Sequence, residues 1–221
     1  MKRLISTEQV SRWHSDKFAD QISDAILDYC LAGDTDSRVA CECLVKGRTV
    51  VLGGEITSKA KPPYKEIVNR VAHKLGYKID KVINLISEQS PEINKAVKNK
   101  TELCAGDQGI MFGYACDDTP ALLPYALDLA NNIIKRLELL KKLSGKHCPL
   151  HGDAKTQVTV NADNEIQAVV LSACHSSEVS LAEAEKYCRQ HILHDLPQDK
   201  IIFNPAGRWT IGGAEADCGL T

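Results

Sequence analysis

A single acid, Asp107, lies among three glycines in the stretch CAGDQGIMFGY, from Cys104 to Tyr114. Glycine lets a backbone bend tightly or approach a ligand where any side chain would block it. The apolar run Ile110–Ala115 follows and is predicted to be a strand, so the carboxylate is expected at a bend where it could act on a ligand. The alternative is a solvated turn aspartate, because Asp and Gly are ordinary turn residues. The pattern alone leaves both interpretations open.

A second group of charged residues, His14, Asp16 and Lys17, precedes an apolar pattern with helical spacing. The free N–H groups at a helix start bind anions. A histidine, a carboxylate and a lysine at such a position suit a phosphate with its magnesium ion. Asp20, Asp24 and Asp28 continue at intervals of four and indicate a solvated helix face.

Two further acids occupy strand positions. Glu42 alternates with the cysteines of an apolar strand, where an acid needs a partner or an ion; the alternative is an exposed edge. Glu55 follows two glycines at the end of the next strand. His147, Cys148 and His151 come close to a zinc pattern, but no second well-spaced pair accompanies them, so we favour a loop without zinc.

Periodicity predicts the elements that position these residues. Helices are expected where apolar residues recur at three and four, namely over 16–31, 64–75, 122–143 and 181–193. Ser180 with Glu183 forms a capping box for the last of these. Strands are expected over 4–10, 38–46, 49–55, 81–86, 155–160, 166–174 and 201–203. The polar stretch 88–101 is expected to be a loop and a candidate lid.

The second half repeats the plan of the first, a hairpin followed by a helix and another strand. The sequence therefore predicts an α+β protein with internally duplicated hairpin-plus-helix units, whose sheets are covered by helices on one face.

Composition excludes several classes of protein. The formal net charge of the 221 residues is −2, which gives no bulk attraction to nucleic acid or anionic lipid. No apolar run approaches the roughly 20 residues of a membrane span, and the start MKRLISTEQ has no signal-peptide core. We therefore expect a cytoplasmic protein, with its nine cysteines as free thiols and with neither nucleic acid nor a membrane as partner.

Seven strings, spread in order over nearly the whole chain, together resemble methionine adenosyltransferases (S-adenosylmethionine synthetases). They are HSDK with ADQISDAILD, VACE, GGEIT, QSPEIN, AGDQGIMFGYA, DAKTQV, and NPAGRWTIGG with DCGLT. The resemblance implies an S-adenosylmethionine synthetase-like fold. It also implies the reaction of methionine with ATP: the sulfur attacks the ribose 5′ carbon, and the triphosphate is released and then cleaved.

Site residues are carried over by the same resemblance. The implied catalytic residues are His14, Lys17, Asp107 and Lys155. The implied ATP-binding residues are these four with Asp153, Arg208 and Trp209, whose indole would stack on adenine. The implied methionine contacts are Glu55, Gln89 and Asp217. Asp16 would hold magnesium, Glu42 would hold potassium, and residues 89–99 correspond to the family's mobile gate.

The resemblance also implies a domain plan. Residues 1–12 with 118–212 would form an N-terminal-type domain, residues 13–96 with 213–221 an incomplete central-type domain, and residues 97–117 a remnant of a third repeat. The matching motif stops at Thr221, so we expect a short or truncated member that lacks the C-terminal part.

Two residues beside His14 depart from the family pattern, since Trp13 and Ser15 stand where the family usually has Gly and Pro. The indole could fill space or crowd the nucleotide. The expected partners are ATP, methionine and further copies of the chain, in a homodimer or homotetramer with shared active sites. The alternative function is a non-catalytic or split-enzyme subunit that binds nucleotide and pairs with a partner chain.

Overall fold

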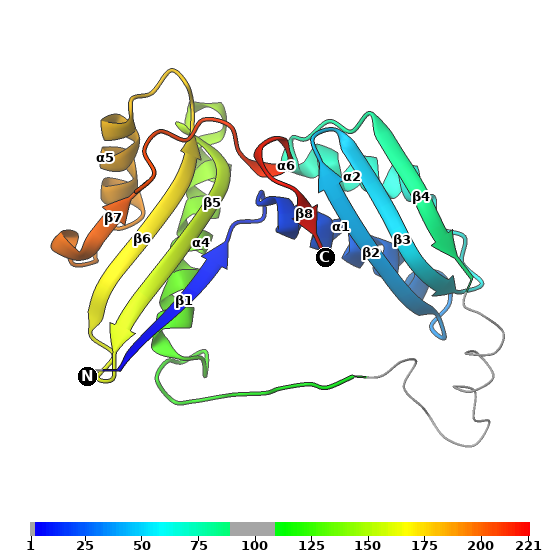
Figure 1. Ribbon diagram of the computed structural model, residues 1–221, viewed down its shortest axis with the longest axis horizontal. Coiled ribbons are helices and arrows are strands. Elements are labelled where there is room, and N and C mark those ends of the chain that lie inside the picture. The colour runs from blue at the N-terminus through cyan, green and yellow to red at the C-terminus, as the bar shows by residue number, and fades with distance from the viewer. Residues whose placement is uncertain (1–2, 89–108) are drawn as a thin grey trace. The chain divides into compact units, whose positions relative to one another are not determined.

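The computed structural model describes residues 3–88 and 109–221, and the chain divides into two compact units (Figure 1). Unit 1 comprises residues 1–14 and 114–216, and unit 2 comprises residues 15–113 and 217–221. Each unit is therefore assembled from two separate pieces of the sequence. The domain limits and domain names implied by the family resemblance stay a prediction.

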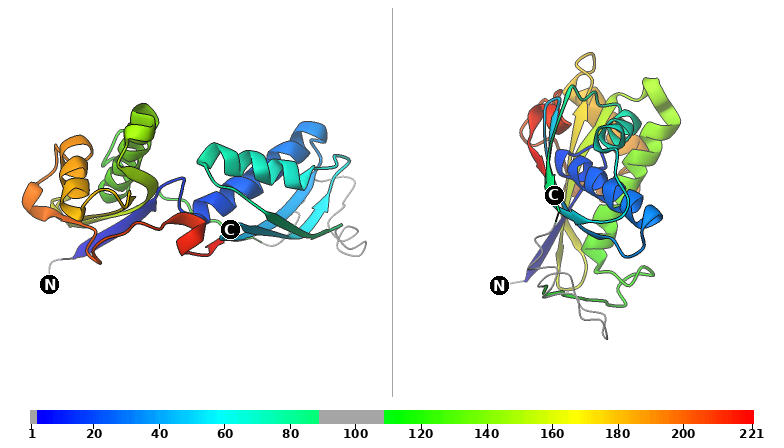
Figure 2. Two further views of the ribbon diagram at one scale, coloured as in Figure 1. Left: turned by 90° about the horizontal axis from the view of Figure 1, so that it is seen from above. Right: turned by 90° about the vertical axis from the view of Figure 1, so that its right-hand side faces the viewer.

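Unit 2 is a four-stranded sheet in the order β4-β3-β2-β8, with two helices on one face (Figure 2). Its elements are α1 (Ser15–Gly33), β2 (Arg38–Lys46), β3 (Thr49–Thr57), α2 (Tyr64–Leu75), β4 (Lys81–Ser87) and β8 (Gly219–Leu220). Strand β2 alternates as predicted: Cys41, Cys43 and Val45 are buried, whereas Glu42 and Leu44 are exposed. Because successive side chains of a strand point to opposite faces, Glu42 lies on the face away from the core.

Helix α2 begins and ends at the residues that the sequence indicates. Pro63 precedes its first residue, and Gly76 ends it with a left-handed φ of 79°. In this conformation Gly76 donates its N–H to the carbonyls of Ala72 and His73, which closes the last turn. The buried stripe Ile67, Val68, Val71, Ala72 and Leu75 faces the sheet.

Unit 1 is also a four-stranded sheet, in the order β1-β5-β6-β7, with helices on one face (Figure 2). Its main elements are β1 (Leu4–Val10), α4 (Tyr125–Ser144), β5 (Leu150–Asn161), β6 (Ile166–His175), α5 (Leu181–His191), β7 (Ile201–Phe203) and α6 (Gly213–Ala216). The predicted capping box of α5 is confirmed: the Ser180 hydroxyl accepts the Glu183 N–H, and the Glu183 carboxylate accepts the Ser180 N–H. One buried apolar cluster joins α4, α5 and the inner face of β5, β6 and β7.

The predicted duplication is confirmed at the level of topology. The order α1-β2-β3-α2-β4 in unit 2 matches the order α4-β5-β6-α5-β7 in unit 1. In each unit the hairpin is antiparallel and its second strand pairs in parallel with the strand after the helix. A strand from the other end of the chain pairs antiparallel with the first hairpin strand, namely β8 with β2 and β1 with β5. The predicted α+β class, with two units of sheet and helix, is confirmed.

One predicted strand is wrong. Residues 110–115 belong to no strand, and the side chains of Ile110, Met111 and Phe112 are 84%, 95% and 95% exposed. An apolar run becomes a strand when a neighbouring strand pairs with its N–H and C=O groups. No strand of the described residues pairs with this one.

Two other predictions fall wholly or largely outside the described residues: the Asp107 bend and the lid at residues 88–101. Within the described ranges, no helix combines the length and hydrophobicity needed to cross a membrane. The cysteines of these ranges are free thiols.

Candidate active site

In unit 2, three of the predicted site residues are tied to the last five residues of the chain. Asp16 Oδ1 accepts the Leu220 N–H at 3.2 Å, and Glu42 Oε2 accepts the Thr221 hydroxyl at 2.5 Å. Asp217 is itself part of this segment, and its Oδ2 accepts the Ser15 hydroxyl at 3.4 Å. Asp16 and Glu42, far apart in sequence, therefore both contact the short segment that carries Asp217. We call this group the α1 cluster.

Close backbone contact places that segment beside α1. A Cβ on Gly219 would lie 2.1 Å from the Ser15 carbonyl oxygen, so only glycine allows the approach. The Thr221 side chain then continues the pairing of β8, because its hydroxyl accepts the Cys43 N–H at 2.9 Å. These contacts hold Asp16 and Glu42 in place without burying them, and both side chains stay exposed.

Lys17 and Glu55 are also exposed residues of unit 2. The Lys17 ammonium pairs with Asp20 at 3.1 Å, in an exposed ion pair of the kind that contributes little stability. Glu55 lies near the end of β3, directly opposite Ala40 on β2 and Ser87 on β4. Gln89 and Asp107 lie outside the described residues.

In unit 1, Asp153 is the most buried of the predicted residues, with 6% exposure. Its Oδ2 accepts the Gly213 N–H at 2.5 Å. A Cβ on Gly212 would lie 2.9 Å from the same oxygen, so the chain at Gly212 and Gly213 covers the carboxylate closely. Asp153 therefore holds the segment that follows Trp209 against β5.

Arg208 and Trp209 lie on the same segment, which runs along the end of β6. The Trp209 carbonyl accepts the His175 N–H at 2.9 Å, and the indole N–H donates to the Ile211 carbonyl at 2.6 Å. The Arg208 guanidinium donates to the Ser177 carbonyl. We call residues 208–213 the β6 strap. Arg208 is exposed and the Trp209 indole is half-buried, so both side chains are accessible.

His14 ends a turn that docks beside Asp153. Its N–H donates to the Ser11 carbonyl at 3.0 Å, and Ser11 pairs with Ala154 through its own N–H at 2.9 Å. Lys155 follows on β5 and its ammonium lies 2.6 Å from Glu8 on β1. The structure thus brings the His14 turn, Asp153, Lys155 and the β6 strap together on unit 1.

Two residues that hold this arrangement could not be recognised as important from the sequence. Ser11 is fully buried; its hydroxyl donates to the Gly152 carbonyl at 2.7 Å and accepts the Ala154 N–H at 3.1 Å. Asn204, 5% exposed, pairs its side-chain amide with both the N–H and the carbonyl of Ala173, at 2.7 and 3.1 Å. Asn204 opens the NPAGRWT string, but its identity alone does not show that its amide takes the place of a strand.

Burial shapes the titration of two side chains near Asp153. Burial raises the pKa of Cys174 to about 12, with a smaller contribution from the Asp153 carboxylate. This thiol is therefore protonated at neutral pH and is not a nucleophile. Burial, and then the charges of Lys141 and His175, lower the pKa of His151. The described residues contain no set of three His, Cys, Asp or Glu side chains placed to hold an ion. The absence of zinc at His147, Cys148 and His151 stays a prediction.

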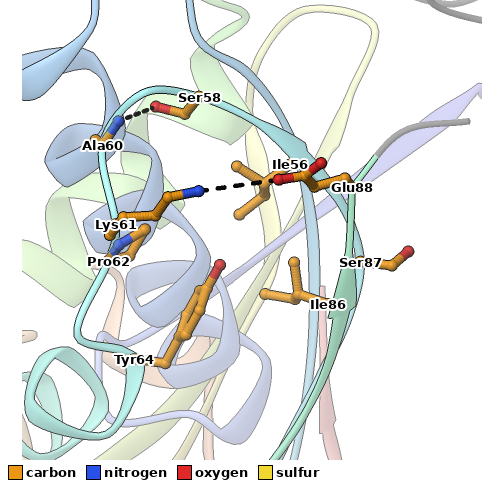
Figure 3. A pocket seen from close by; sticks show the side chains of 9 residues that line it. All are labelled: Ile56, Ser58, Ala60, Lys61, Pro62, Tyr64, Ile86, Ser87 and Glu88. Carbon is orange, nitrogen blue, oxygen red and sulfur yellow. Dashed lines mark hydrogen bonds and ion pairs between the residues drawn. The ribbon is translucent and has the colours of Figure 1, made fainter. Parts of the chain in front are cut away.

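A pocket of about 180 Å³ lies elsewhere in unit 2, where the ends of β3 and β4 meet the start of α2 (Figure 3). Ile56, Ile86 and Tyr64 form its apolar walls, and Lys61 and Glu88 pair at 3.9 Å across it. Both of these charged side chains are more than 80% exposed. No predicted site residue lines this pocket, so it is separate from the α1 cluster.

Fold and site together define an α+β protein of two topologically equivalent units, with acids and cations gathered at a helix start and at the end of a strand hairpin. Family models match nearly the whole chain: the S-adenosylmethionine synthetase N-terminal domain matches residues 2–102, and the S-adenosylmethionine synthetase central domain matches residues 102–209. An S-adenosylmethionine synthase of Sulfurovum sp. (strain NBC37-1) is 38% identical over 240 residues, covering 99% of this chain. The chain spans 62% of the length of that relative.

The chain belongs to the S-adenosylmethionine synthetase family. The family predicted from the seven sequence strings is thereby confirmed.

Proposed function

We propose that this chain forms S-adenosylmethionine from methionine and ATP. The observation that carries the proposal is membership of the family over residues 2–209, with the family's charged strings retained. In the reaction a sulfur lone pair forms the bond to the ribose 5′ carbon. The carbon–oxygen bond breaks, and its electron pair leaves with the triphosphate. The product is a sulfonium ion, and water then cleaves the triphosphate.

The cations of the site serve the leaving group in this proposal. Negative charge grows on the departing oxygen, and preorganised positive groups stabilise it there. His14 and Lys17 are assigned to the triphosphate, with Lys155 and Asp107 completing the catalytic set. Lys17 is accessible for this purpose because its ion pair with Asp20 is exposed.

The β6 strap is assigned to the nucleotide. The half-buried Trp209 indole offers a flat face for adenine. Arg208 is exposed beside it, and Asp153 holds the strap by accepting the Gly213 N–H. Glu55, Gln89 and Asp217 are assigned to methionine, whose ammonium group suits carboxylate partners.

The donor sets suit the two implied metal ions. Magnesium is usually held by one or two carboxylates with substrate phosphates, and Asp16 is an exposed carboxylate at a helix start, where phosphates bind. Magnesium would neutralise phosphate charge when bound. Glu42 and the adjacent Thr221 hydroxyl are oxygen donors that would contribute to a potassium site.

Self-association, as a homodimer or homotetramer with shared sites, is part of the proposal. Four apolar residues lie in register across the exposed face of the unit 2 sheet: Leu220, Leu44, Val51 and Ile83. Leu220 and Leu44 are 54% and 37% exposed, and Leu85 of the next row is 65% exposed. Exposed apolar rows of this kind favour protein contacts. Light scattering after size exclusion gives the mass in solution.

Turnover by the purified chain tests the function. The chain is incubated with ATP, methionine, magnesium and potassium, and S-adenosylmethionine is measured by mass spectrometry. We expect Asp16→Asn to lower kcat/KM about 100-fold, as for loss of a group that stabilises transition-state charge. Asp28→Asn, an exposed acid of the same helix, is the matched control and should change little.

Other outcomes decide against turnover. Binding of ATP without product in the wild-type chain would favour the alternative of a nucleotide-binding subunit. Absence of both binding and product would contradict the proposal.

A further inference from the structure

The turn that carries His14 is fastened to unit 1 at several points. Ser11 pairs with β5 through its backbone and its hydroxyl, as described above. The Arg12 N–H donates to Glu138 Oε1 on α4 at 2.9 Å, and the Arg12 guanidinium lies 3.2 Å from the other oxygen of that carboxylate. The residue between these anchors and His14 is Trp13.

The Trp13 indole is half-buried and has two cations close to its ring. The Lys141 ammonium is 5.8 Å from the ring centroid, and the Arg12 guanidinium carbon is 5.9 Å from it. Both distances are within the range of cation–π attraction. The cations are themselves tethered, since Lys141 donates to the Leu150 carbonyl at 2.9 Å and Arg12 pairs with Glu138.

Gly152 provides the space for the indole. A Cβ at this position would lie 2.7 Å from the indole Cδ2 and 3.0 Å from the Lys141 side chain. The φ of Gly152 is +109°, a conformation that residues with side chains rarely adopt. The Trp13 indole therefore packs against residue 152 in a space that only glycine leaves open, which we call the Gly152 seat.

We propose that Trp13 is a positioning residue that sets the location of the His14 imidazole. One peptide bond separates the two residues, so a rotation of the Trp13 backbone displaces His14 directly. The tethered cations and the Gly152 seat prevent that rotation. The inference rests on the proposed function for the role of His14 at the triphosphate. In such a site a displacement of about 1 Å can lower the reaction rate about 100-fold. It assigns to Trp13 the space-filling role, not the crowding of the nucleotide.

The test follows the His14 ring signals by NMR, assigned with a His14→Gln variant, together with the Kd of ATP by calorimetry. We expect Trp13→Ala to shift or broaden the His14 signals and to raise the Kd about 10-fold or more. Trp13→Phe keeps a flat ring and should restore both readouts towards wild type. Lys141→Met should act in the same direction as Trp13→Ala, whereas Lys142→Met, its exposed neighbour, is the matched control and should not.

A double-mutant cycle separates positioning from a general loss of structure. If Trp13 acts through His14, Trp13→Ala should add little to the Kd in a His14→Gln background. An equal rise in both backgrounds would overturn the inference, as would unchanged His14 signals. Tighter ATP binding by Trp13→Ala would also overturn it, because the indole would then be crowding the nucleotide.

The same data distinguish this inference from the proposed function. If the His14 signals respond while the wild-type chain neither binds ATP nor forms S-adenosylmethionine, the positioning stands and the function fails. If the wild-type chain forms S-adenosylmethionine while the His14 signals ignore residue 13, the function stands and the positioning fails.

Discussion

Three buried polar side chains take the place of backbone pairing around the candidate site. Asn204 pairs with Ala173 as a strand would, Ser11 bridges Gly152 and Ala154, and Asp153 accepts the N–H of the β6 strap. Irregular backbone carries N–H and C=O groups that must be satisfied when buried. These side chains satisfy them, so irregular segments bearing His14 and Trp209 can lie against a regular sheet.

Replacing Asn204 by alanine should destabilise unit 1. It leaves two buried groups of Ala173 without the Asn204 amide, and such losses cost about 1–3 kcal/mol. Urea unfolding followed by circular dichroism measures the change. Asn69→Ala, on the exposed face of α2, is the control and should alter stability by less than about 0.5 kcal/mol. An unchanged urea midpoint for Asn204→Ala would show that its amide is not needed by the sheet.

Asp153 variants should separate structure from ligand binding. Asp153→Ala removes the acceptor of the Gly213 N–H and should lower the free energy of unfolding by about 1–3 kcal/mol. Asp153→Asn keeps an acceptor oxygen, so it should be more stable than Asp153→Ala. If the carboxylate also contacts ATP, both variants should bind ATP weakly.

Asp163→Ala, in the exposed β5–β6 turn, is the matched control for these variants and should resemble wild type in both measurements. Wild-type stability in Asp153→Ala would contradict the role of this carboxylate in holding the strap.

At the scale of elements, local patterns predicted most of the helices and both hairpins. The alternation of β2, the stripe of α2 and the capping box of α5 each depend on residues close in sequence, and each is confirmed. Pairings between distant segments could not be predicted in this way. The register of β1 with β5 and of β8 with β2 depends on how the chain ends return to the two sheets. The strand expected at 110–115 failed for the same reason, since an apolar run does not specify a partner.

The candidate site also combines features that the sequence predicted with features that only the tertiary structure shows. Motif strings named the charged residues, but the joining of Asp16, Glu42 and Asp217 through the last five residues is a tertiary result. The placement of Asp153 beneath the β6 strap also required the fold. The roles assigned to these residues stay predictions.

Helix α4 is joined to the segment that follows α5 by an ion pair with a defined pH dependence. Arg136 donates to both carboxylate oxygens of Asp195, at 2.6 and 2.7 Å, and also to the Ile192 carbonyl. The hydrogen bonds from Arg136 lower the pKa of Asp195 below its usual 3.8. The contribution of the pair to stability is therefore complete above the unfolded pKa near 3.8 and disappears as the pH falls through the lower folded pKa.

Removing this pair should lower the Tm at neutral pH but not in strong acid. Both side chains are partly exposed, so the coupling between Arg136→Met and Asp195→Asn should stay below about 1 kcal/mol at pH 7. A double-mutant cycle by thermal unfolding, repeated from pH 7 down to pH 2.5, measures it. The cycle also excludes the separate bond from Arg136 to Ile192. A coupling that is constant over this range would show that Asp195 does not titrate with the pair.

At the scale of the whole molecule, each unit carries its own buried thiols, which makes the unfolding of each separately visible. Cys41 and Cys43 lie in the core of unit 2, and Cys174 and Cys188 lie in the core of unit 1. Burial raises the pKa of Cys41 to about 11 and those of the other three to about 12. Cys218 is exposed. Because the thiolate is the reactive form, Cys41, Cys43, Cys174 and Cys188 are protected both by their low exposure and by protonation.

We therefore expect iodoacetamide at pH 8 to modify Cys218 in the native protein and to modify the four core cysteines only after unfolding. Raising the pH to 10 should still spare the core cysteines, since their pKa values remain above it. In pulses of reagent at increasing urea, read by peptide mass spectrometry, Cys41 and Cys43 should share one midpoint and Cys174 and Cys188 another, because each unit has a core of its own. Cys218→Ser removes the Cys218 signal and serves as the control. Labelling of Cys188 as fast as Cys218 without urea, or different midpoints within one unit, would show that the cores do not open as these two blocks.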